Sequence, residues 1–247
     1  MDLNADLAEG FGHWELGDDE AMLDVVTSAN VACGFHAGDA LTMRRVCAYA
    51  RERGVAVGAQ VGYRDLPGFG RRFIAYEHNQ LRDELIYQIG ALDALARTEG
   101  VRVAYVKPHG ALYHATVHAE AIVDAVRDLD PKLPVLCSPG SVLATAASDA
   151  ALKVIFEGFA DRGYLPDGSL MPRSKAGAVV TDTEEVVARA LLMATEQRVI
   201  AFEGTVIDLP VDSICLHGDT PGAVQLGLAV RAALTEAGVP LQRFTTV

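Results

Sequence analysis

The sequence lacks the short motifs that identify several common enzyme classes. Its 247 residues contain no phosphate-binding P-loop, no HExxH zinc motif, no GxSxG nucleophile elbow and no CxxC pair. Mechanisms that depend on those motifs therefore lose their usual support. No GxGxxG follows the first expected strand either, and this absence disfavours the dinucleotide-binding kind of open α/β sheet.

Basic residues are also few, since 21 lysines and arginines stand against 33 acidic residues and the formal net charge is −12. Phosphate binding needs clustered basic side chains, so we expect neither a nucleic-acid surface nor an anionic-membrane surface. No apolar run reaches the length of about 20 residues that crosses a membrane. The chain opens with Asp2, Asn4 and Asp6 instead of a basic region and an apolar stretch, so we expect a cytoplasmic protein.

Cysteine is scarce as well, and the few cysteines lie far apart in apolar segments. Reduced, buried cysteines fit this spacing better than a disulfide framework or a zinc cluster. The residues concerned are Cys33, Cys47, Cys137 and Cys215.

Apolar segments typical of buried strands alternate with segments of helical periodicity along the chain. Half of the residues are hydrophobic, which suits strands covered on both faces. About seven strands alternate in this way, one fewer than in a complete barrel, so we predict a distorted (β/α)7 barrel. A doubly wound open sheet is the alternative. The predicted strands span 1–7, 25–32, 55–60, 103–107, 135–138, 152–156 and 213–216.

No linker-like segment interrupts the chain, so we expect one barrel domain over residues 1–247. Two stretches that contain glycine and proline, 61–72 and 167–177, are expected to form long functional loops, the first of them a lid over the site. Residues 199–209 break the alternation, because short apolar runs flank Glu203-Gly204, and they predict a hairpin.

The strongest signal for a site is the end of the strand at 103–107. Its β-branched and aromatic residues stop at Lys107-Pro108-His109-Gly110, where proline and glycine end the strand pairing. A lysine at the end of a buried strand needs an anion or a carboxylate partner.

The other predicted strands also end in polar or ionisable residues. Because the carboxyl ends of parallel barrel strands share one face, we expect these side chains to converge on one water-accessible pocket. The residues at these ends are Asp6, Glu9, His36, Asp39, Gln60, Lys107, His109, Glu157, Asp161, Arg162, His217 and Asp219.

Some of the candidates have structural alternatives. Asp39 and Asp219 precede helices, and capping is as good an explanation for each as catalysis. Arg71-Arg72 on the first long loop either clamps a carboxylate or phosphate group or is a pair of solvated charges. His114 and His118 are four residues apart and could bind a metal ion from one helical face, but their segment is polar and begins a helix, so we expect both on the surface.

Several longer motifs resemble those of the LamB/YcsF family, whose members are the A subunits of the prokaryotic 5-oxoprolinase. The resemblance covers almost the whole chain, and several motifs in one order make chance agreement improbable. The motifs are Asp2-Leu3-Asn4-Ala5-Asp6-Leu7, residues 28–39, Gly68-Phe69-Gly70-Arg71-Arg72, residues 87–92, residues 106–113, Phe159-Ala160-Asp161-Arg162 and Cys215-Leu216-His217-Gly218-Asp219.

The resemblance implies ATP-dependent opening of the lactam ring of 5-oxo-L-proline to L-glutamate, together with subunits B and C. It also implies a barrel similar to that of carbohydrate deacetylases. ATP is then a co-substrate, and the sequence leaves open whether it binds this chain or a partner, because no ATP site is recognisable.

Opening a lactam by phosphorylation of its oxygen needs cations against the developing negative charge, a base for water and an acid for the ring nitrogen. On this basis Lys107 and Arg162 are the expected cationic stabilisers, and His36 and His109 are the expected acid and base. The full expected catalytic set is Asp6, His36, Lys107, His109, Arg162 and His217; the expected substrate contacts are Glu9, Asn30, Gln60, Arg71, Arg72, Glu157 and Asp161; and the expected ligands of a divalent metal are Asp6 and Asp219.

The chain departs from the family pattern at Gln60, where relatives usually have histidine, at Ala8 for glycine, at Arg64 for proline and at His114 for asparagine. Two other functions therefore stay open. One is a stand-alone, metal-dependent deacetylase or amidohydrolase, and the other is a non-catalytic partner that binds 5-oxoproline. A homo-oligomer also stays open.

Overall fold

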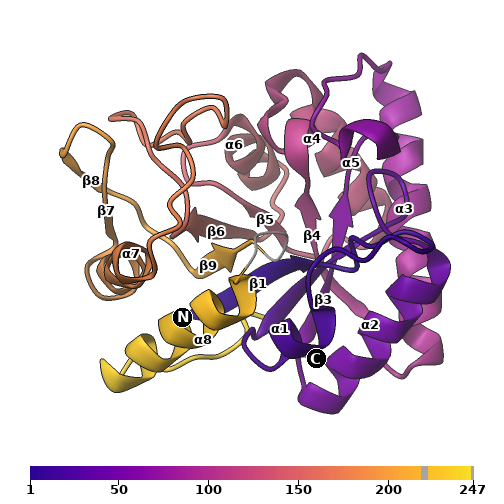
Figure 1. The fold of residues 1–247 in the computed structure, drawn as a ribbon. Coiled ribbons are helices and arrows are strands. Elements are labelled where there is room, and N and C mark those ends of the chain that lie inside the picture. Colours follow the sequence, from indigo (N-terminus) through magenta and orange to yellow (C-terminus); the bar gives the residue numbers. More distant parts are fainter. Residues whose placement is uncertain (218–221, 246–247) are drawn as a thin grey trace.

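Seven parallel strands close into a barrel in the part of the chain that this computed structural model describes, residues 1–217 and 222–245 (Figure 1). β9 pairs with both β6 and β1 and so completes the ring. This arrangement confirms the distorted (β/α)7 barrel and excludes the open sheet. The barrel strands are β1 (Asp2–Leu7), β2 (Ser28–Ala32), β3 (Ala56–Val61), β4 (Val103–Pro108), β5 (Val135–Cys137), β6 (Val154–Phe159) and β9 (Ser213–Leu216).

The alternation of side chains along β1 gives the barrel a polar interior and an apolar exterior. Leu3 and Leu7 pack in the core between the strands and the surrounding helices. Asn4 and Asp6 point to the other side, where both accept hydrogen bonds from Asn30 of β2. The barrel interior therefore presents ionisable and amide groups to whatever enters its open end.

Helices surround the barrel (Figure 1), and α2 shows how residues at both ends can fix one of them. Asp39 caps α2 by accepting a hydrogen bond from the backbone N–H of Thr42, which confirms its capping role, and Gly54 ends the same helix in the left-handed region. The helices are α1 (Asp19–Leu23), α2 (Ala40–Arg53), α3 (His78–Thr98), α4 (Gly110–His114), α5 (Ala119–Leu129), α6 (Val142–Asp149), α7 (Thr183–Glu196) and α8 (Ala223–Glu236), with 3-10 turns at Leu66–Gly68 and Thr116–His118.

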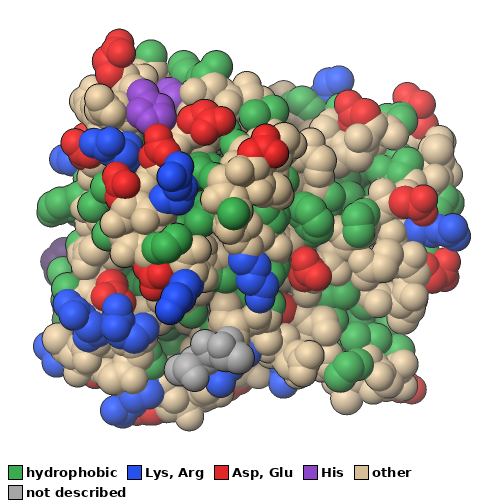
Figure 2. All heavy atoms as spheres, turned by 180° about the vertical axis from the view of Figure 1, so that it is seen from behind, with side chains coloured by type: hydrophobic (Ala, Val, Ile, Leu, Met, Phe, Trp, Pro, Cys, Tyr) green, Lys and Arg blue, Asp and Glu red, His purple; other side chains and the backbone are tan. Residues whose placement is uncertain are grey.

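A separate antiparallel pair, β7 (Arg198–Ile200) and β8 (Val206–Asp208), projects beside α7 in Figure 1. No helix in the described ranges is long and apolar enough to cross a membrane. The cysteines are all free and buried, as expected. On the face shown in Figure 2, basic side chains are interspersed with acidic ones.

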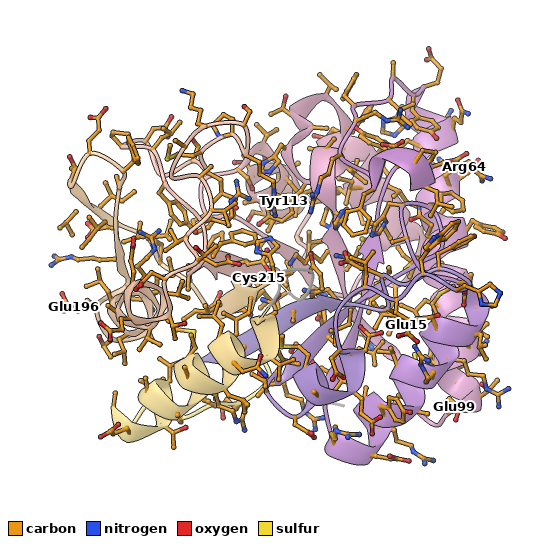
Figure 3. The ribbon with its side chains drawn as sticks, in the orientation of Figure 1. Glu15, Arg64, Glu99, Tyr113, Glu196 and Cys215 are labelled. Atoms are coloured by element: carbon orange, nitrogen blue, oxygen red, sulfur yellow. The ribbon has the colours of Figure 1, made fainter. Side chains whose placement is uncertain are left out.

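The amino ends of the strands are closed by a small apolar cluster of their own. Tyr105 of β4 packs there with Leu136 and Ile155, and the ring of Phe244 lies 4.9 Å from the Tyr105 ring. Figure 3 shows Tyr113 and Cys215 in the middle of the molecule, while Glu99 and Glu196 lie at its periphery. The opposite, carboxyl ends of the strands are left for the site.

Candidate active site

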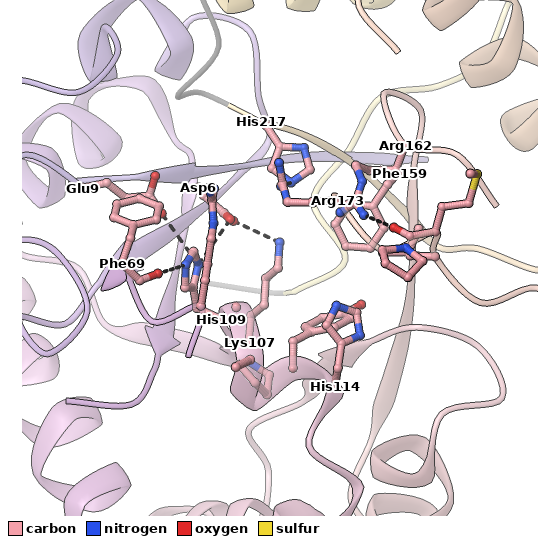
Figure 4. A pocket seen from close by; sticks show the side chains of 18 residues that line it. Asp6, Glu9, Phe69, Lys107, His109, His114, Phe159, Arg162, Arg173 and His217 are labelled. Carbon is pink, nitrogen blue, oxygen red and sulfur yellow. Dashed lines mark hydrogen bonds and ion pairs between the residues drawn. The ribbon is translucent and has the colours of Figure 1, made fainter. Parts of the chain in front are cut away.

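A cavity of about 440 Å³ opens at the carboxyl ends of the barrel strands (Figure 4). This volume lies within the usual range of small-molecule sites, roughly 300–1,000 Å³. The walls include five of the six residues expected to be catalytic, since only His36 is set back from the surface of the cavity. Those five are Asp6, Lys107, His109, Arg162 and His217.

Lys107 lies at the centre of the cavity floor with its side chain 3% exposed. Its ammonium nitrogen is 3.0 Å from Asp6 Oδ1 and 2.8 Å from Glu157 Oε1, and it also donates to Cys215 Sγ at 3.3 Å. Burial works against the charged form, but the neighbouring carboxylates outweigh it and hold the pKa of Lys107 well above its usual value. These shifts favour the charged form of Lys107. The sequence predicted a carboxylate partner for this lysine, and the structure provides two, Asp6 and Glu157.

Asp6 is the second ionised group of the floor. Burial alone would raise its pKa, but Lys107 and His109 more than compensate, and the pKa is held well below its ordinary value. Asn30 donates to the same carboxylate at 2.9 Å. Asn30, which we expected to touch substrate, is fully buried beneath Asp6, where it supports the carboxylate.

An axial hydrogen-bond chain runs down the barrel interior from Asp6 to Asp2. Asn30 donates to Asn4 at 2.7 Å, Asn4 donates to the Ser213 hydroxyl at 2.7 Å, and that hydroxyl donates to Asp2. Thr27 and Ser28 add two more hydroxyl donors to Asp2, at 2.6 and 2.7 Å. Burial nevertheless dominates at this end and raises the pKa of Asp2.

Gln60 lies behind His109 and is fully buried, so it does not reach the cavity wall where we expected it to touch substrate. Its amide nitrogen is 2.9 Å from His109 Nδ1 and 3.3 Å from Glu9 Oε1, and its oxygen is 3.2 Å from His36 Nε2. The rings of His36 and His109 stack with centroids 4.0 Å apart. Burial and the neighbouring His109 lower the pKa of His36 well below its usual value, which favours the neutral ring.

Glu9, His36 and His109 are close enough to share a metal ion, because their ligand atoms all lie within 4.8 Å of one another. The expected ligand Asp6 is instead paired with Lys107, and Asp219 lies outside the described residues. The Gln60 amide already bonds to all three side chains. As they stand, these residues therefore do not fit a metal without displacement of the amide.

Glycines allow the loop after β3 to fold tightly over this cluster. A Cβ on Gly110 would lie 2.5 Å from the carbonyl oxygen of Gly70, and one on Gly70 would lie 2.8 Å from His36 Cβ. The same loop separates the two adjacent arginines: Arg71 lines the cavity, whereas Arg72 turns away and pairs with Asp65. The expected clamp of two arginines is thus reduced to Arg71.

The opposite wall of the cavity holds a second histidine with a carboxylate behind it. His217 Nδ1 is 2.7 Å from Asp161 Oδ2, and Arg173 Nη2 is 2.9 Å from His217 Nε2. A guanidinium only donates, so Nε2 carries the lone pair and Nδ1 donates its proton to Asp161. Arg173 was not expected from the sequence, although it lies within the long loop predicted at 167–177 and lines the cavity.

Arg162 supports that loop from below. Its guanidinium donates to the carbonyl oxygens of Met171 at 2.7 Å and of Ala178 at 2.9 Å, while its side chain forms part of the cavity wall (Figure 4). Arg162 therefore shapes the segment that carries Arg173, in addition to adding positive charge near the cavity.

Three further residues singled out in the sequence are Glu157, His114 and His118. Glu157 is fully buried and bonds to Lys107 and to the Tyr113 hydroxyl, at 3.0 Å for the latter. Of the two histidines expected on the surface, His114 is exposed as expected, whereas His118 is not. His114 lines the cavity, and His118 is buried in contact with the Tyr63 hydroxyl at 2.6 Å.

Comparison with known proteins gives one consistent picture. The model of the LamB/YcsF family matches residues 1–247. The 5-oxoprolinase A subunit of Nocardia farcinica is 55% identical, and that of Streptomyces avermitilis is 57% identical, each over 99% of both chains. The crystal structure of a lactam utilization protein from Thermus thermophilus superposes with a TM-score of 0.94 at 42% identity over 99% of both chains.

Proposed function

The chain belongs to the LamB/YcsF family, and we propose that it is the A subunit of a 5-oxoprolinase, which opens the lactam of 5-oxo-L-proline to L-glutamate with consumption of ATP. The names of relatives that share more than half of its residues over 99% of their length support this activity. We further propose that subunits B and C are required and that ATP enters with them as co-substrate.

The observation that carries the proposal is the Lys107 ammonium, 3.0 Å from Asp6, on the floor of a cavity whose walls also include Arg71, Arg162 and Arg173. A lactam carbonyl is a poor electrophile, so ATP phosphorylates its oxygen first. ADP is the leaving group of that step. One water then adds to the ring carbon, and the ring nitrogen takes a proton and leaves, which gives an acyl phosphate. A second water hydrolyses the acyl phosphate to the side-chain carboxylate of glutamate and free phosphate. Negative charge grows on the carbonyl oxygen and the transferred phosphoryl group, where a fixed ammonium is most effective.

The two walls suggest how the substrate lies. The carboxylate of 5-oxo-L-proline faces Arg71 and Arg173, and the lactam carbonyl faces Lys107. His109, with Asp6 beside it, and His217, with Asp161 behind it, then flank the ring on either side. One imidazole activates water and the other protonates the departing nitrogen, which is the division of labour that this reaction needs.

The decisive test is ATP-dependent glutamate release by this chain alone, with subunits B and C, and with Lys107→Met in the same complex. We expect turnover only in the complete complex and a loss of at least about 10²-fold on removal of the ammonium group. Lys132→Ala, at an exposed lysine, is the matched control and should retain activity. Circular dichroism and Lys107→Arg, which keeps the charge, separate loss of chemistry from loss of folding.

Full activity of Lys107→Met in the complete complex would remove Lys107 from the mechanism. Binding of 5-oxo-L-proline without turnover would instead favour a non-catalytic partner. One alternative enzyme is a stand-alone metal-dependent amidohydrolase, which would require Glu9, His36 and His109 to bind an ion after displacement of the Gln60 amide. That alternative predicts ATP-independent deacetylation of acetamido sugars by the isolated chain and its loss on treatment with a chelator.

A further inference from the structure

Gln60 is the point at which four loops or strand ends of the site meet. It lies near the carboxyl end of β3, and its amide touches Glu9 from the segment after β1, His36 from the segment after β2 and His109 from the end of β4. All four side chains are buried. A single amide therefore contacts all three groups, in addition to the direct stacking of the His36 and His109 rings.

The direction of each hydrogen bond follows from the chemistry of the partners. A carboxylate accepts, so the amide nitrogen of Gln60 must face Glu9, because the opposite orientation would set oxygen against oxygen. The same nitrogen is 2.9 Å from His109 Nδ1, which is therefore an acceptor. The proton of His109 then lies on Nε2, which donates to the carbonyl oxygen of Phe69 at 3.1 Å.

His36 completes the pattern from the other end of the amide. Its Nε2 is 3.2 Å from the Gln60 oxygen and donates to it. The unprotonated Nδ1 lies against Gly62, where a Cβ would come within 2.5 Å of it. The lone pair of His36 consequently points away from the centre of the cluster, and a proton occupies the nitrogen that faces the centre.

A metal ion would need lone pairs from all three side chains directed at one point. Here two of those lone pairs, on Glu9 and His109, are already taken by amide N–H groups, and the facing nitrogen of His36 carries a proton. We propose that the Gln60 amide takes the place of a divalent cation in this chain, so that the cluster is assembled and His109 is held in its Nε2–H form without metal. This inference holds whichever substrate the cavity accepts.

The proposal makes Gln60→Glu an informative change, because the new carboxylate has nearly the shape of the amide but only accepts. The two N–H donors disappear, and a cation is then needed to hold the acceptors together. Equilibrium dialysis against zinc at neutral pH, followed by metal analysis, gives a direct readout. We expect no stoichiometric zinc on the wild-type chain and about one equivalent on Gln60→Glu.

Two further samples keep the test decisive. Gln60→Glu combined with His109→Gln should lose the bound zinc, which shows that the ion lies in this cluster. Nitrogen-15 spectra of the wild-type histidine rings should show His109 protonated at Nε2, with no change on addition of zinc. Thermal unfolding of each variant identifies a sample that has failed to fold, and Gln60→His then replaces Gln60→Glu.

Stoichiometric zinc on the wild-type chain, with a change in the His109 signals, would overturn the proposal, because the amide would have yielded to the ion. Folded Gln60 variants that take up no zinc would overturn it as well. Neither result depends on glutamate release, so failure of the proposed function and failure of this inference can be told apart.

Discussion

Asp2 and Asp6 are two carboxylates on one strand, and their surroundings shift their pKa values in opposite directions. Burial raises the pKa of Asp2, whose contacts are hydroxyl groups, whereas the ammonium of Lys107 helps to hold the pKa of Asp6 well below its usual value. The pair lies four residues apart along β1 and faces the same interior. Local contacts, and not depth of burial, therefore decide the direction in which each pKa moves.

A pH prediction follows for Asp2→Asn. Because the folded-state pKa of Asp2 is raised, its carboxyl group stabilises the fold most below its unfolded pKa, about 3.9, and that contribution is lost as the pH rises through the folded pKa. Asparagine does not titrate. The midpoint of urea unfolding should therefore shift in favour of the variant as the pH rises above about 4. A difference between the two proteins that stays constant over this range would contradict the prediction.

Residues at strand ends were the part of the site that the sequence could predict. Lys107 and His109 stand out because a buried strand stops at them, and the cavity confirms their convergence with Asp6. The depth of a side chain could not be predicted, because it depends on strand register. Gln60 pairs with Lys107 across β3 and β4, yet it is buried behind His109 instead of reaching the cavity.

At the scale of elements, α2 and α6 end in the same way but with different residues. Gly54 follows α2 with φ of 67°, and Ala151 follows α6 with φ of 60°. In both cases the next residue donates back to the helix, Val55 to Ala50 and Leu152 to Ala147. This helix ending favours glycine, because a Cβ is strained in the left-handed region.

Replacing Ala151 by glycine and Gly54 by alanine should therefore change the free energy of unfolding in opposite directions. Ala151→Gly should raise the free energy of unfolding by about 0.5–1 kcal/mol, since Ala151 is exposed and loses little packing, and Gly54→Ala should lower it by about 1 kcal/mol. Urea titration of both variants against the wild type is the measurement. Destabilisation by Ala151→Gly would show that the strain at this residue is relieved in some other way.

Elements that follow a period were predictable, whereas the path of the long loop after β6 was not. The alternation of apolar and polar residues marks the strands, because it is fixed by the pleat and by burial. The loop instead depends on tertiary contacts such as those of Arg162 with the carbonyls of Met171 and Ala178. No local pattern encodes these contacts, and this is why Arg173 was not recognised as a residue of the cavity.

At the scale of the whole molecule, the cavity and the apolar cluster around Tyr105 lie at opposite ends of the barrel. The carboxyl ends of the strands hold the charged cavity, and Phe244 packs on Tyr105 at the amino ends. Strand count and closure could be anticipated from the regular alternation of elements. The segment that closes the bottom could not, because Phe244 belongs to no periodic stretch.

Phe244→Ala should accordingly affect folding and leave the site intact. We expect a loss of about 1–2 kcal/mol in the free energy of unfolding, less than for a fully buried phenylalanine because Phe244 is only partly buried. Phe202→Ala, at a ring that is 61% exposed, is the control and should change stability by less than about 0.5 kcal/mol. Loss of 5-oxo-L-proline binding by folded Phe244→Ala would contradict this separation of the two ends.

The axial hydrogen-bond chain cannot conduct protons from one end of the barrel to the other. Its middle links are the amides of Asn4 and Asn30, whose protons stay on nitrogen, so a proton cannot hop along them as it can along water or hydroxyl groups. The interior of the barrel is therefore an insulator for protons despite its unbroken hydrogen bonding. A proton released by Asp2 therefore cannot reach Asp6 along this chain of hydrogen bonds.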